Sequence, residues 1–254
     1  MRGTLSNLPE AIKLFKNYSS AAVHDAAVLR RLLINVKTKD DLAAALALVR
    51  VTVGDAPLIM VAFFGDVGFD AALHINLGWP APWMELYAGQ RYDTVDPVVL
   101  GPAGVVLPWS PLLLGMKPVS VLERRFHRAA RASGMTHGLS FKATWPDCRV
   151  ILSLTGKDVE EHRMTRELLE IIMPDLVAVA YRVFASNRLL AKMTVNQRLI
   201  INCMLKQGLT QRQAALHLNM TPSGIRYNID QLKTEYGCAT IEQLMFKLGA
   251  GENS

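Results

Sequence analysis

Residues 210–221 read TQRQAALHLNMT and contain the starts of two helices. Thr210 precedes Gln213 by three residues, the spacing of a capping box, in which each side chain bonds the backbone N–H of the other residue. Thr221 precedes Pro222, and proline suits the first helical position because its missing N–H would have no partner there. Two helices of about 9 and about 15 residues, joined by a short turn, have the layout of a helix-turn-helix.

The second of these predicted helices has two different faces. Its apolar residues recur at helical spacing and would pack inward: Ile225, Ile229, Leu232 and Tyr236. The polar face suits the major groove of DNA, because Arg226 can bond a guanine edge at two points while hydroxyl and ammonium groups position a helix through phosphates. The candidate DNA contacts are Arg212, Thr221, Ser223, Arg226, Tyr227, Asp230 and Lys233. A helical dimerisation unit with ordinary solvated charges is the alternative.

Capping-box spacings also occur on both sides of this segment. Thr194 with Gln197 and Thr240 with Gln243 repeat the capping-box spacing, and strand patterns stop near residue 186. We therefore predict an all-α domain at 193–254 after a linker at 186–192. Residues 188–254 hold eight Lys or Arg against four acids, which is most of the chain's formal net charge of +6 and is consistent with an anionic partner.

This segment resembles the C-terminal DNA-binding domain of LuxR-type transcriptional regulators. The resemblance rests on residues 210–221 together with Ser223, Ile225, Asn228, Ile229 and Gly237. It implies a helix-turn-helix that binds a two-fold DNA site as a homodimer. The sequence departs from the usual pattern of the family at Gly224 and at Glu235, which leaves the operator sequence open.

The part of the chain before residue 186 mixes helix and strand patterns. Helical spacing is found at 20–53, 121–132 and 159–185. Thr38 with Asp41 has the spacing of a capping box inside the first of these ranges. Short apolar or alternating runs predict strands at 58–64, 69–77, 138–143 and 149–154. Because helices and strands do not alternate regularly, we expect an α+β fold at 1–185, an α/β/α sandwich with helices on both faces of one sheet.

Aromatic residues gather in the middle of this part. Three of the four tryptophans, Trp79, Trp83 and Trp109, lie within 31 residues. Trp83 and Tyr87 are four residues apart and so share one face of a helix, and each has one polar group on an apolar body. Such side chains suit a mostly apolar ligand pocket with a few fixed polar points. Simple core packing is the alternative, and Asp96, which precedes a proline, could be a turn residue.

The spacing from Trp83 to Asp96 resembles the autoinducer-binding domain of the same LuxR-type family, in which an antiparallel sheet and its helices hold an N-acyl homoserine lactone. The resemblance implies that the Trp83 indole N–H donates to the lactone carbonyl. It also implies that the Asp96 carboxylate accepts from the ligand's amide N–H and that the Tyr87 hydroxyl donates to the acyl carbonyl.

Further positions match the same domain. The resemblance implies that Ser153 adds a hydroxyl near the ligand amide and that Trp79 and Trp109 wall the lactone ring. Gly138 falls at a glycine of the family. Lys142 stands where a proline is common.

Other classes of protein are not expected. The three cysteines form no CxxC pair and no histidine lies at metal-ligand spacing, so the sequence predicts neither a disulfide framework nor a metal site, and a reducing, cytoplasmic setting. The uncharged run 97–116 is interrupted by four prolines and would not form a membrane helix, so we expect a soluble protein. No nucleophile-elbow, zinc-protease or nucleotide-binding motif occurs, and neither an enzyme nor a cofactor is expected. Four arginines at 124–131 are expected to form an ordinary solvated helix face.

The sequence therefore predicts a quorum-sensing transcriptional regulator that binds an N-acyl homoserine lactone and, as a homodimer, DNA. Two alternatives remain open. A regulator of the same fold with a different ligand, or none, is favoured if Val98 and Lys142 reshape the pocket. A modulator that forms heterodimers with a related regulator and binds DNA weakly is favoured by Glu235 and by Asn196, which replaces an acid usual in the family.

Overall fold

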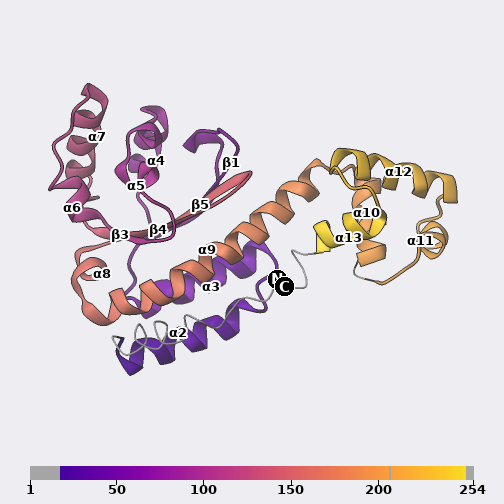
Figure 1. Ribbon diagram of the computed structural model, residues 1–254, viewed down its shortest axis with the longest axis horizontal. Helices are drawn as coiled ribbons and strands as arrows, with labels where there is room; N and C mark the ends of the chain where they lie inside the picture. Colours follow the sequence, from indigo (N-terminus) through magenta and orange to yellow (C-terminus); the bar gives the residue numbers. More distant parts are fainter. Residues whose placement is uncertain (1–17, 206, 250–254) are drawn as a thin grey trace, which may run out of the picture. The chain divides into compact units, whose positions relative to one another are not determined.

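The computed structural model describes residues 18–205 and 207–249. The chain divides into two compact units, Met1–Tyr181 and Arg182–Ser254. The division falls within helix α9, Arg163–Lys192, which also includes the predicted linker 186–192. Figure 1 shows the sheet of the first unit and the helices of the second. Our domain limits, 1–185 and 193–254, stay a prediction.

The first unit is built on one antiparallel sheet in the strand order β2-β1-β5-β4-β3. The strands are β1 Leu58–Phe64, β2 Leu73–Leu77, β3 Val106–Pro108, β4 Gly138–Trp145 and β5 Cys148–Thr155. All seven residues of β1 are buried, so both faces of the central strands are covered. β4 and β5 form a hairpin in which Trp145 pairs with Cys148.

Helices cover the two faces of this sheet. In Figure 1, α2 Ser20–Leu33, α3 Lys39–Thr52 and α9 lie on one side of it. The other side carries α4 Ala81–Gly89, α5 Pro97–Leu100, α6 Trp109–Leu113 and α7 Val121–Ala132. The predicted combination of helices with an antiparallel sheet is confirmed.

Three details differ from the sequence prediction. The range 69–77 is a 3-10 turn, η2 Phe69–Ala71, followed by the short strand β2, because the apolar pattern alone does not separate a turn from a strand. The range 159–185 holds two helices, α8 Lys157–Glu161 and α9, with His162 between them. Strand β3 was not predicted, since it is three residues long and ends in proline.

The second unit consists of helices in its described part. They are α10 Val195–Leu205, α11 Gln211–His217, α12 Pro222–Glu235 and α13 Ile241–Gly249. Thr210 and Gln213 form the predicted capping box, and Thr221 caps α12 by accepting from the Gly224 N–H at 3.1 Å. α11 is 7 residues long, shorter than predicted. The predicted inner face of α12 is confirmed as buried, in a core shared with Ile200, Ala215 and Leu244.

The uncharged run 97–116 contributes α5, β3 and α6 to the first unit. Within residues 18–205 and 207–249, no helix combines the length and the apolar character needed to cross a membrane.

Candidate ligand-binding site

Helix α4 presents two of the predicted ligand residues to the sheet. Trp83 and Tyr87 are both buried, and their ring centroids are 5.7 Å apart, as expected for neighbours one helical turn apart. Phe69, Tyr92 and Phe126 pack around them, with the Phe69 ring 4.8 Å from that of Tyr87. We call these five residues the aromatic cluster. The sequence analysis missed its last three members, whose places in η2, η3 (Tyr92–Thr94) and α7 only the fold brings together.

Asp96 joins the aromatic cluster through Tyr87. The Tyr87 hydroxyl donates to Asp96 Oδ2 at 2.7 Å, and the Val98 N–H donates to Asp96 Oδ1 at 2.8 Å, so Asp96 also caps helix α5. Burial raises the pKa of Asp96 to about 6, although both of these hydrogen bonds act to lower it. The pKa of the Tyr87 hydroxyl is raised well above its usual value by burial and then by the charge of Asp96. The Asp96 carboxylate therefore both caps helix α5 and accepts the hydrogen bond of Tyr87.

A chain of polar groups connects Trp109 to Ser153. The Trp109 indole N–H donates to Ser140 Oγ at 2.8 Å, and Ser140 Oγ lies 2.7 Å from Ser153 Oγ. Ser140 and Ser153 are paired residues of β4 and β5, so they share the sheet face that α4–α7 cover. The Trp79 ring meets Trp109 edge to face at 5.8 Å. The structure thus brings Trp79, Trp109 and Ser153 together and adds Ser140.

Two buried indole N–H groups in this region have no partner in the described part of the chain. Among the described residues, no acceptor lies within hydrogen-bond distance of Trp79 Nε1 or Trp83 Nε1. A buried donor without a partner costs about 1–3 kcal/mol, so native proteins rarely keep one without a reason. The two N–H groups are suited to a ligand that brings carbonyl oxygens.

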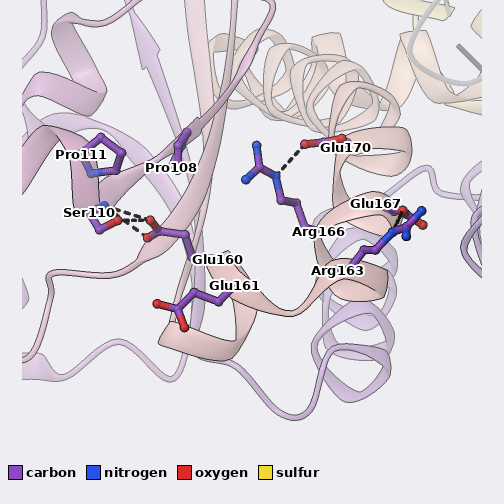
Figure 2. A pocket seen from close by; sticks show the side chains of 9 residues that line it. All are labelled: Pro108, Ser110, Pro111, Glu160, Glu161, Arg163, Arg166, Glu167 and Glu170. Atoms are coloured by element: carbon purple, nitrogen blue, oxygen red, sulfur yellow. Dashed lines mark hydrogen bonds and ion pairs between the residues drawn. The ribbon is translucent and has the colours of Figure 1, made fainter. Parts of the chain in front are cut away.

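A cavity of about 550 Å³ lies elsewhere in the first unit. Figure 2 shows its lining, which consists of Pro108, Ser110, Pro111, Glu160, Glu161, Arg163, Arg166, Glu167 and Glu170. The arginines are already paired, Arg163 with Glu167 at 2.7 Å and Arg166 with Glu170 at 2.9 Å. Both arginines of this cavity therefore already have carboxylate partners within its lining.

One wall of this cavity nevertheless supports the candidate site. The buried Glu160 accepts from the backbone N–H and the hydroxyl of Ser110 and, at 2.9 Å, from the Gly138 N–H. Ser110 follows Trp109 in α6. Glu160, which the sequence analysis missed, therefore holds in place the helix that presents Trp109.

The candidate DNA contacts lie on or next to α11 and α12. Arg212, Ser223, Arg226, Tyr227 and Asp230 are exposed, as is Thr221, whose hydroxyl caps α12, and Lys233 is half-buried. Tyr227 accepts from Gln231 Nε2, and Lys233 pairs with Asp230 at 3.0 Å. In the part of the chain that the structure describes, Arg212 and Arg226 make no hydrogen bond or ion pair with another side chain.

Comparisons with known proteins point to one family. The family model "Autoinducer binding domain" matches residues 39–186. The HTH-type quorum sensing-dependent transcriptional regulator RpaR of Rhodopseudomonas palustris is 28% identical over 97 residues, which is 37% of this chain and 40% of RpaR. The match thus spans well under half of that relative's length.

Solved structures of similar proteins were also found. Escherichia coli SdiA aligns with 91% of this chain and 98% of its own at 13% identity, with a TM-score of 0.49. CepR2 of Burkholderia cenocepacia, described as an N-acylhomoserine lactone dependent LuxR family transcription factor, aligns with 65% of this chain and 96% of its own at 16% identity, with a TM-score of 0.47.

Proposed function

The chain belongs to the LuxR-type regulators with an autoinducer-binding domain, and from this premise we propose that it binds an N-acyl homoserine lactone and, as a homodimer, DNA. The lactone would lie against the aromatic cluster, with Trp83 donating to the ring carbonyl and Asp96 accepting from the amide N–H. Tyr87 would donate to the acyl carbonyl, Ser153 would add its hydroxyl, and Trp79 and Trp109 would wall the ring.

This proposal is carried by the Trp83 N–H, which is buried without a partner among the described residues, beside the Tyr87–Asp96 pair. An N-acyl homoserine lactone has two carbonyls and an amide N–H near one end, so it needs two donors and one acceptor there. The indole and the carboxylate supply one donor and one acceptor, and the phenol supplies the second donor by turning its O–H from Asp96 to the acyl carbonyl. Binding would satisfy a donor that is otherwise buried without a partner, and so would stabilise the folded sensor.

A thermal melting screen tests the ligand. Full-length protein produced without lactone is melted with N-acyl homoserine lactones of increasing chain length. A ligand present at 100 times its Kd should add about 2.7 kcal/mol to the free energy of unfolding, and the melting temperature should rise accordingly. A panel in which no lactone raises the melting temperature would count against the proposal.

The DNA-binding half of the proposal predicts different roles for two arginines. Arg226, exposed near the start of α12, would read a base edge, and Arg212 on α11 would contact the DNA backbone. Arg226→Ala should then cost about 1–3 kcal/mol of binding free energy at the cognate site and relax the sequence preference. Arg212→Ala should weaken binding to all DNA sequences by the same amount.

Random-site selection with the purified protein, followed by titration of each variant on the selected site and on unrelated DNA, measures both effects. The selection should return a motif with two-fold symmetry. Selection of no such motif would contradict homodimeric DNA binding, and equal losses on all sequences for Arg226→Ala would make Arg226 a phosphate contact.

A further inference from the structure

Among the described residues, Arg149 in β5 has no hydrogen-bond acceptor and no ion-pair partner, and it lies on the sheet face that also carries the candidate ligand residues. Its guanidinium carbon lies 4.5 Å from the centre of the Phe63 ring. Its Nε is buried, and among the described residues it has no hydrogen-bond acceptor. No ion pair involves it in the described part of the chain either. The contact with the Phe63 ring helps to hold the guanidinium in place, and its Nε–H is left for another group.

The strand register places Arg149 in line with Ser153. Alternate residues of a strand point to the same face, so Arg149, Ile151 and Ser153 share one face. Arg149 pairs with Phe63 of β1, a member of the same buried core as Trp83 and Trp109. Four residues along a strand span about 13 Å, which separates the backbone at Arg149 from the backbone at Ser153.

The charge of Arg149 reaches the candidate site. It lowers the pKa of Tyr87 in part, against the larger effects of burial and Asp96, and it also lowers the pKa of Lys142, for which burial is the first cause. Lys142 itself is occupied, because its Nζ donates to the carbonyl oxygens of Val99, at 2.7 Å, and Gly101. Lys142 thus already has two acceptors, whereas Arg149 has no hydrogen-bond acceptor among the described residues.

We propose that Arg149 recognises the far end of the acyl chain, and that the ligand is a homoserine lactone whose chain carries a carboxylate near that end. This inference rests on the proposed function. A ligand whose amide lies by Asp96 and Ser153 would extend along the sheet face toward Phe63 and Arg149. A chain that ends in a methyl group would cover the guanidinium without bonding it, and covering an unpaired charge is costly. An oxygen there forms a charge-assisted hydrogen bond instead.

Paired ligands test the proposal with the full-length protein. N-octanoyl, N-decanoyl and N-dodecanoyl homoserine lactones are each compared, by isothermal titration, with the analogue whose terminal methyl is replaced by a carboxylate. At the length that reaches Arg149, the wild-type protein should bind the carboxylate analogue at least about tenfold more tightly than its methyl partner.

Three variants assign the preference to Arg149. Arg149→Met, which keeps the length and removes the charge, should lose the preference for the carboxylate or reverse it. Arg149→Lys should keep part of it, and Arg125→Met, at an exposed site on α7, should behave like the wild type. Arg149→Lys retains a cation and so still reports on the idea if the methionine variant does not fold.

The outcomes distinguish a failure of the Arg149 role from a failure of the proposed function. If the wild type binds lactones with no preference for the carboxylate at any length, or if the preference persists in folded Arg149→Met, the role of Arg149 is wrong and the proposed function stands. If neither series binds the wild type, the proposed function fails and this inference fails with it.

Discussion

Replacing Asp96 with asparagine should weaken lactone binding by about 1.5–3 kcal/mol, the range for a hydrogen bond to a charged group. The carboxylate accepts from Tyr87 and from the Val98 N–H; on binding, the one Tyr87 O–H would turn to the acyl carbonyl and the amide N–H of the ligand would take its place at the carboxylate. An asparagine has one acceptor oxygen, and its NH₂ group would face one of these donors. Isothermal titration of the purified full-length protein measures the loss.

Asp93→Asn is the matched control for this experiment. Asp93 is a buried neighbour whose carboxylate lies 3.3 Å from Arg91 Nε, and its charge acts on Tyr87 and Asp96 only weakly, after burial and the Tyr87–Asp96 contact. Its replacement should leave lactone affinity close to that of the wild type. Unchanged affinity in Asp96→Asn would mean that Asp96 serves only as the cap of α5.

The raised pKa of Asp96 also predicts a pH dependence. Burial raises this pKa to about 6, whereas an unfolded chain has a value of about 3.9. The folded state therefore holds the proton more tightly, so the contribution of Asp96 to the free energy of unfolding is greatest below about pH 4 and falls by up to about 3 kcal/mol as the pH rises through 6. Lactone affinity should rise over the same interval, because the ligand N–H bonds best to the ionised carboxylate.

Urea unfolding of the wild type and Asp96→Asn from pH 4 to 7.5 isolates this effect. Other carboxylates titrate alike in both proteins, so the difference between the two unfolding free energies reports Asp96. As the pH rises, the free energy of unfolding of the wild type should fall relative to that of the asparagine variant. A constant difference across this range would show that the Asp96 carboxyl titrates normally.

Gly138→Ala should lower the free energy of unfolding by about 3 kcal/mol or more, at the upper end of the effect of overpacking a core. A Cβ at this position would lie 2.2 Å from the Leu154 carbonyl oxygen and 3.0 Å from the Trp109 ring. The backbone cannot move away easily, because Gly138 is paired with Thr155 in the sheet and its N–H is held by Glu160. Denaturant unfolding measures the loss, and lactone binding should weaken with it because Trp109 is displaced.

Gly134→Ala is the control for Gly138→Ala, because it introduces backbone strain without crowding. Gly134 has a φ of +71°, and a Cβ there would meet nothing within 4 Å. The left-handed conformation alone costs a non-glycine residue about 1–2 kcal/mol. Equal losses in the two variants would mean that the contact with Trp109 and Leu154 is not what requires glycine at 138.

Features that depend on neighbours in the chain were predictable. The capping boxes at Thr38 and Thr210, the start of α12 at Thr221 and the shared face of Trp83 and Tyr87 involve residues at most four apart. Helical and strand periodicities act over the same short range. The resemblance to a known family added the expected ligand class and a role for each site residue.

Features that join distant segments were not predictable. Trp109 meets Ser140 across 31 residues and Ser110 meets Glu160 across 50, and no periodicity encodes either pair. The place of β3 at the edge of the sheet depends on its pairing with β4, which a three-residue strand does not signal by itself.

The sequence by itself determined most of the helix and strand composition, the two-part organisation and the candidate residues Trp83, Tyr87 and Asp96, because local backbone preference and side-chain chemistry are carried by the residues themselves. Only the tertiary structure decided which polar groups are satisfied. It paired Tyr87 with Asp96 and left the N–H groups of Trp79 and Trp83 and the Arg149 guanidinium without acceptors among the described residues. A buried polar group finds a hydrogen-bond partner only if the fold brings a suitable atom from elsewhere in the chain to within about 3 Å of it.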